Sequence, residues 1–293
     1  MKIYKTTSII ALTFLLFICS CVSFSPEWNK SEVTEATDTV NILLQKAKNM
    51  ELNASTSQEL KELIDCYLEI EKIDPNNYLA LWKIGNYQIL MGAAYATDKK
   101  TKKHHYREAI KYCEKAMYTN EAFRKEISDK KKIVEACEVL TINEIDAMGY
   151  WYTARFYYFK ECINPLGKAL NTSIVIENNK VIDCIDKINP NWAGGGNYFS
   201  RALYYIATPK RFGGSLERAD TEFSTAIKVG PNFIVNRWGR AKYLYSLTGN
   251  EAGFKSDMEW VIAQDPHKGG NPYAWNIYFQ NDAKKELIKL ENN

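Results

Sequence analysis

Four pairs of residues that end in proline divide this sequence into helical segments, and they constrain the fold more than any other feature. The positions 12, 8 and 5 residues before each proline are apolar or small, with one asparagine as the poor fit. Offsets of four and three residues place such positions on one face of a helix. Because proline ends a helix and sets the turn into the next, we predict successive amphipathic helices. The three positions are Leu63, Tyr67 and Ile70 before Asp74-Pro75; Asn178, Ile182 and Ile185 before Asn189-Pro190; Ala219, Phe223 and Ala226 before Gly230-Pro231; and Phe254, Met258 and Val261 before Asp265-Pro266.

This arrangement resembles the tetratricopeptide repeat, a helix–turn–helix unit of about 34 residues. Residues 215–231 fit its second helix best, and the interval from Pro231 to Pro266 is close to the period. Residues 106–116 form another second helix, which ends at Asn120-Glu121 without a proline. First helices are predicted at 77–91, 198–207 and 234–247, with insertions at 93–105, 120–175 and 208–214. An irregular helical bundle without a repeat is the alternative.

The composition favours helix over sheet and excludes several classes of protein. A chain of 293 residues with 25% charged and 46% hydrophobic residues is globular, which excludes wholesale disorder and a multi-span membrane protein. A net charge of +3 is too small for a nucleic-acid binder that works through bulk charge. We therefore predict an all-α fold, a tetratricopeptide-like helical-repeat solenoid with additional helices, and no nucleic-acid partner.

The first twenty residues have the pattern of a lipoprotein signal peptide. Lys2 and Lys5 precede an apolar run at 9–18, which is too short to span a membrane. The run ends in Ile18-Cys19-Ser20-Cys21, which matches the lipobox and makes Cys21 the lipidated residue. We predict a signal peptide at 1–20, a lipidated tether at 21–30 and one helical domain at 31–293. A plain signal peptide with an incidental pair of cysteines is the alternative.

The residues that would carry catalysis or bind a metal are sparse in this sequence. Five cysteines remain after Cys19 and Cys21, and none has the spacing of a zinc ligand. We interpret Cys66, Cys113 and Cys184 as small buried residues of helices. His104 and His105 follow a lysine run that we place in a loop, and no catalytic motif surrounds them. We expect no enzyme activity, no cofactor and no metal, and the glycines at 194–196 and 213–214 to serve turns or close helix contacts.

Residues 150–159 contain seven aromatic side chains in ten positions. A helix with that sequence is apolar nearly all round, so it lies between layers or against a partner. Pro165 and Gly167 end it. Basic and aromatic residues of this run and of two predicted first helices are the candidates for contact with a ligand or partner. A buried guanidinium in the run needs an anionic or aromatic partner, and first helices line the concave face of a repeat stack. The candidates are Trp151, Tyr152, Arg155, Arg201, Trp238 and Arg240; core packing with local salt bridges is the alternative.

An ordered series of landmarks resembles the TatT family, the lipoprotein T-component associated with some TRAP transporters (tripartite ATP-independent periplasmic transporters). After the lipobox come an Asp-Pro-Asn boundary at 74–76 and Tyr-Trp-Tyr-Thr-Ala at 150–154. Asn-Pro-Asn-Trp-Ala-Gly-Gly-Gly at 189–196 follows. Tyr204-Tyr205 and Pro209 then precede Gly213-Gly214, and the resemblance covers about residues 21–290. The basic segment 98–105 and the missing proline of the second boundary depart from it.

The resemblance implies an all-helical solenoid that assembles as a homotrimer. It implies docking of the transporter's periplasmic solute-binding protein and a route for a small hydrophobic ligand. We therefore expect a lipid-anchored, periplasm-facing accessory of a TRAP transporter, with the choice of inner or outer membrane left open. The alternative is a tetratricopeptide scaffold for envelope or outer-membrane assembly, which would have the same fold and anchor.

Overall fold

The structure, a computed structural model, describes residues 38–292. The predicted signal peptide, Cys21 and tether lie outside the described residues. Within residues 38–292 the chain forms helices and no strand, so the predicted all-α helical-repeat fold is confirmed. The first half of the described chain contains α2 (Asp38–Glu51), α3 (Ser57–Ile73), α4 (Tyr78–Leu90), α5 (Lys99–Tyr118), α6 (Glu121–Ser128) and α7 (Ile133–Ala136).

The second half of the described chain holds nine further α-helices and packs on the first. They are α8 (Ile145–Tyr157), α9 (Pro165–Leu170), α10 (Ser173–Ile188), α11 (Trp192–Ala207), α12 (Leu216–Val229), α13 (Ile234–Gly239), α14 (Ser246–Thr248), α15 (Glu251–Ala263) and α16 (Tyr273–Glu291). Three π-helical turns continue α4, α8 and α13, and two 3₁₀ turns lie in connections. These turns are η2 (Met91–Tyr95), η4 (Tyr158–Cys162), η6 (Arg240–Tyr245), η3 (Cys137–Val139) and η5 (Lys210–Phe212).

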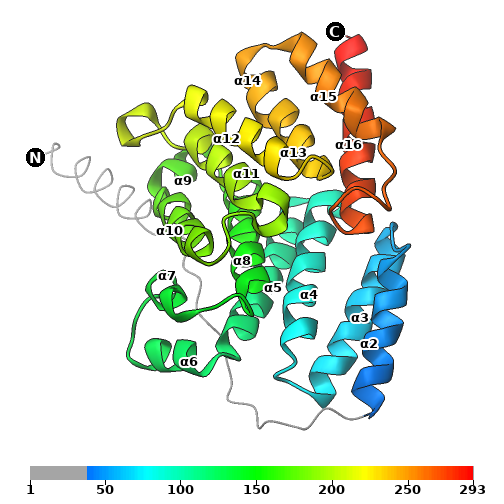
Figure 1. Cartoon of the computed structure of the whole chain (residues 1–293), viewed down its shortest axis with the longest axis vertical. Coiled ribbons are helices and arrows are strands. Elements are labelled where there is room, and N and C mark those ends of the chain that lie inside the picture. Colours follow the sequence, from blue (N-terminus) through cyan, green and yellow to red (C-terminus); the bar gives the residue numbers. More distant parts are fainter. Residues whose placement is uncertain (1–37, 293) are drawn as a thin grey trace, which may run out of the picture.

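The long helices stack in chain order, and the end of the stack returns to its beginning. Contacts run from α2 to α3, α4 and α5, then through α8, α10, α11 and α12 to α13, α15 and α16 (Figure 1). The last helix then meets α4, where Trp275 Nε1 donates a hydrogen bond of 2.7 Å to Asn86 Oδ1. A repeat stack normally buries its apolar faces only between neighbours. Here the hydrogen bond between α16 and α4 also joins the end of the stack to its beginning.

The predicted helix register is confirmed at every proline boundary. The three positions before each proline are buried, as are Ala109, Cys113 and Ala116 of α5. Asn178, the poor fit, is also buried, and its Nδ2 donates a hydrogen bond of 2.9 Å to the carbonyl oxygen of Tyr152. A buried asparagine is tolerated at this position because part of its polar side chain is hydrogen-bonded.

The loop predicted for the lysine run, His104 and His105 is wrong. Only a short turn follows η2, and α5 begins at Lys99, so the lysine run, His104 and His105 all lie on a helix. Asp98 caps this helix, since its side chain accepts a hydrogen bond of 2.9 Å from the backbone nitrogen of Thr101. The charge run masked a helix start because Asp98 is followed by lysines rather than by a periodic apolar pattern.

Two smaller expectations are confirmed. The aromatic segment ends at Cys162, and a new short helix starts at Pro165, with Asn164 as its N-cap. The five cysteines of the described residues are free and buried, among them Cys66, Cys113 and Cys184.

No helix within residues 38–292 combines the length and the hydropathy that crossing a membrane requires.

Candidate functional site

A partly open cavity of about 140 Å³ lies between the helices of the stack. Its wall comes from α8, α10, α11, α13, η6 and α16, and no Asp, Glu, Lys, Arg or His of the described chain is among its lining residues. Eleven aromatic rings form most of this wall: Tyr150, Tyr152, Phe156, Tyr157, Trp192, Phe199, Tyr204, Trp238, Tyr243, Trp275 and Phe279. An uncharged aromatic wall suits an apolar or neutral organic molecule, because a bound charge would lose its hydration without gaining an ionic partner.

A left-handed turn at the start of α11 sets the position of Trp192 in the wall. Ala193, Gly194 and Gly195 have φ values of 49°, 60° and 91°, a conformation that is disfavoured for alanine and freely open to glycine. A Cβ atom on Gly195 would lie 2.9 Å from the Cα of Ala226, so α11 and α12 need a glycine there. The turn directs the Trp192 indole onto Gly149, where a Cβ atom would lie 1.9 Å from the ring.

Polar atoms at the edges of the rings hold the wall in place. The Trp192 indole nitrogen donates a hydrogen bond of 2.8 Å to Asp146 Oδ1. The Trp238 indole nitrogen donates one of the same length to Asp282. Ser200 Oγ donates one of 2.9 Å to the hydroxyl of Tyr152, whose pKa is raised because the phenol is buried. These hydrogen bonds fix the polar edges of the three rings, and Ser200 itself lines the cavity.

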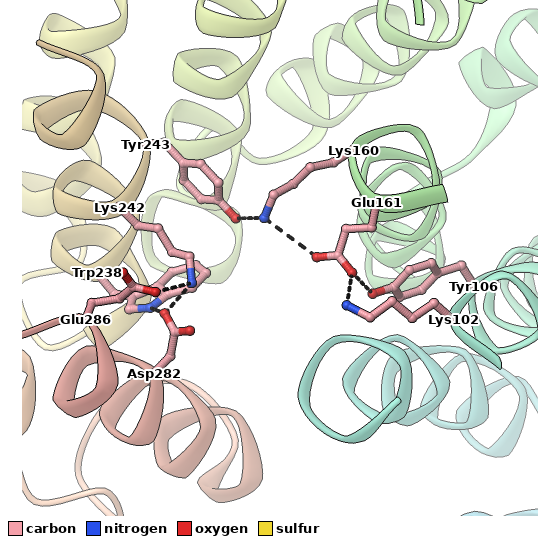
Figure 2. Close-up of polar contacts among 9 residues, drawn as sticks. All are labelled: Lys102, Tyr106, Lys160, Glu161, Trp238, Lys242, Tyr243, Asp282 and Glu286. Atoms are coloured by element: carbon pink, nitrogen blue, oxygen red, sulfur yellow. Dashed lines mark hydrogen bonds and ion pairs between the residues drawn. The ribbon is translucent and has the colours of Figure 1, made fainter. Parts of the chain in front are cut away.

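A network of charged groups joins the two halves of the stack beside this wall (Figure 2). Lys160 of η4 donates a hydrogen bond of 2.9 Å to the hydroxyl of Tyr243 on η6, and its Nζ lies 3.7 Å from Glu161 Oε1. Glu161 also accepts hydrogen bonds from Lys102 Nζ, at 2.7 Å, and from the hydroxyl of Tyr106, at 2.8 Å. Burial lowers the pKa of Lys160, which the carboxylate of Glu161 opposes.

The structure brings two of the six predicted site residues into the cavity wall, Tyr152 and Trp238. Trp151 lies behind the wall, where its indole nitrogen donates a hydrogen bond of 2.9 Å to Glu114 Oε1. The guanidinium of Arg155 stacks over the Trp151 ring at 4.3 Å and forms an ion pair with Glu177. These side chains form a buried cluster within one subunit.

The other two predicted arginines pair with carboxylates outside the cavity. Arg201 bonds to Asp183 at 2.9 Å and also to Asp186. Arg240 donates bidentate hydrogen bonds of 2.7 and 2.9 Å to Asp257, and this carboxylate is almost fully buried. Two donors on one carboxylate fix the orientation of a guanidinium. In this structure both arginines therefore connect helices.

Sequence reasoning missed the contributions of η6 and α16 to the wall, chiefly Tyr243, Trp275 and Phe279. No local pattern marks them, and Trp275 and Phe279 lie on α16, which returns from the end of the chain to α4. The sequence did carry a signal for other parts of the cavity wall. The landmark segments 150–154 and 189–196, together with Tyr204, supply much of the wall, so the residues that suggested a family are also the residues that build the cavity.

The chain is thus a helical-repeat protein whose helices surround a cavity lined by uncharged, mostly aromatic side chains. The chain belongs to the TRAP transporter T-component family, which it matches over residues 89–292. The match includes every residue of the cavity wall and confirms the resemblance seen in the sequence landmarks. As a component of a TRAP transporter, the protein is therefore located in the bacterial cell envelope. A comparison with curated proteins gave no match.

Proposed function

We propose that this chain is a lipid-anchored, periplasm-facing accessory of a TRAP transporter that docks the solute-binding protein and holds a small hydrophobic ligand. Membership of the T-component family supports the role in transport. The observation that supports a ligand is the cavity of about 140 Å³ with its eleven aromatic rings. An engineered apolar cavity of about 150 Å³ stays dry and binds benzene, so this volume is enough for a compact aromatic molecule.

Benzene and the cavity tryptophans test the ligand part of the proposal. Trp192, Trp238 and Trp275 line the cavity, so binding of benzene should shift the tryptophan emission and raise the melting temperature. Thr153 is a small residue of the wall, and Thr153→Phe should fill the space and abolish both effects. Thr221→Phe is the control, because Thr221 is exposed on α12. Equal benzene binding by wild type and Thr153→Phe would refute a ligand site in this cavity.

Two measurements test the docking and the anchor. The solute-binding protein encoded beside TRAP membrane subunits in the same genome should bind the mature chain in calorimetry. If the chain is instead a scaffold for envelope assembly, the two proteins should not bind each other. The intact mass of the membrane-extracted chain should show an N-terminus at an acylated Cys21. A mature N-terminus downstream of residue 21 would rule out the lipid anchor.

A further inference from the structure

The helix α5 carries a concentration of positive charge that the rest of the chain does not share. Its twenty residues include six lysines and Arg107, against Glu108 and Glu114, and Glu114 is buried. Yet the whole chain has a net charge of only +3. We define the α5 basic face as Lys100, Lys103, Arg107 and Lys111. Their spacing of three, four and four residues places them on one side of the helix, over about 17 Å at a rise of 1.5 Å per residue.

Three lysines at the start of α5 are not used in ion pairs within the described residues. The first turns of α5 contain Lys99, Lys100 and Lys103, where the positive end of the helix dipole disfavours cations. Within residues 38–292 these three lysines form no ion pair, whereas the neighbouring Lys102 is paired with Glu161 at 2.7 Å. Charges that oppose the helix dipole and lack carboxylate partners in the described chain are better explained by an external anionic partner than by folding.

Aromatic rings support the basic face from below. Lys103 Nζ and the Arg107 guanidinium lie over the Tyr158 ring, at 5.9 and 5.7 Å, and Lys111 lies over Tyr112 at 5.9 Å. Tyr158 is 1% exposed and Tyr112 is 8% exposed. Because these rings are fixed, they restrict the basic side chains that lie over them. Less side-chain conformational entropy is then lost when a partner binds.

We infer that the α5 basic face is a docking surface for the acidic face of a protein partner. The inference rests on the proposed function, in which the partner is the solute-binding protein. A membrane-bound amphipathic helix inserts apolar side chains into lipid, but the apolar side of α5 is buried in the core through Tyr106, Ala109 and Ile110. Glu108 and Glu161 also interrupt the positive charge, a mixed pattern that suits a complementary protein surface better than a uniformly anionic bilayer.

The test is a charge reversal of Lys100 and Lys103 in the mature, detergent-solubilised chain. Lys100→Glu with Lys103→Glu should weaken binding of the solute-binding protein about tenfold at low salt, mostly through slower association. The loss should shrink at high salt, because screening removes the attraction in the wild type. Glutamate near a helix N-terminus is favourable, so both substitutions leave the helix intact. The control reverses Lys228 and Lys255, exposed lysines of α12 and α15, and should change binding less than about twofold.

The outcomes separate this inference from the function on which it rests. Binding that both variants retain equally would overturn the docking surface and leave the proposed function standing. Absence of binding by the wild type would overturn the proposed function, and the docking surface with it. Vesicles of phosphatidylglycerol form a second arm. If the Lys100 and Lys103 reversal abolishes vesicle binding but leaves partner binding unchanged, the face binds lipid and the inference is wrong.

Discussion

Glu114 is a carboxyl group that the fold removes from water. It is 2% exposed, and burial raises its pKa from 4.5 to about 7, against the opposing effects of the Trp151 hydrogen bond and the charge of Arg155. The folded chain therefore binds a proton between these two pH values that the unfolded chain has released. The free energy of unfolding should fall as pH rises from about 4.5 to about 7 and be insensitive to this group outside that window.

We predict that Glu114→Gln removes this pH dependence. The amide oxygen of glutamine still accepts the hydrogen bond from Trp151, but the side chain no longer ionises. The difference in unfolding free energy, variant minus wild type, should therefore rise by about 2 to 3 kcal/mol from pH 5 to pH 8. Urea unfolding at the two pH values measures the difference. Parallel stability profiles for the two proteins would show that Glu114 keeps its ordinary pKa in the folded state.

At the scale of the single helix, α12 is the best test of the repeat register. Phe223 is 0% exposed and packs edge-on against Phe199, with ring centres 5.6 Å apart. Phe223→Ala should therefore lower the unfolding free energy by about 3–5 kcal/mol. Ser224→Ala is the matched control, because Ser224 is exposed on the same helix. Chemical denaturation compares the two variants, and a loss below about 1 kcal/mol for Phe223→Ala would place this residue outside the core.

Helix faces could be predicted because burial repeats with the helical period, which is why positions as different as Phe223, Cys113 and Asn178 all proved buried. The start of α5 could not, since its first turns are stabilised by the Asp98 cap rather than by apolar burial. Glycines 194 and 195 were correctly assigned to a turn or a close contact, but their left-handed conformation depends on α12 and α13.

The cavity is a property of the whole molecule. Its wall needs α8 and α11 from the middle of the chain together with α16. Distant segments are joined beside it, because Trp275 of α16 bonds to Asn86 of α4 and Lys160 of η4 bonds to Tyr243 of η6. Sequence periodicity describes each helix but not where the last one returns. For the same reason only Tyr152 and Trp238 of the six predicted residues proved to line the cavity.

The aromatic helix that suggested subunit contact is largely covered by its own chain. In the segment 150–159, Trp151, Tyr152, Tyr157, Tyr158 and Phe159 are all buried within one subunit. A trimer must therefore use other apolar side chains. Leu166 and Leu170 lie four residues apart on α9 and are 59% and 52% exposed, a pairing that leaves apolar surface in water unless another subunit covers it.

We predict that the soluble chain of residues 22–293 is a trimer and that Leu166→Glu with Leu170→Glu converts it to monomers. A charge at each position would have to be desolvated in a subunit contact, whereas in an isolated subunit both stay in water. Ile42→Glu with Leu52→Glu is the matched control, because these residues are similarly exposed near the N-terminal end of the described chain. Size exclusion with light scattering measures the mass. A wild-type monomer would contradict the trimer, and a trimer that survives the α9 substitutions would place its interface on another face.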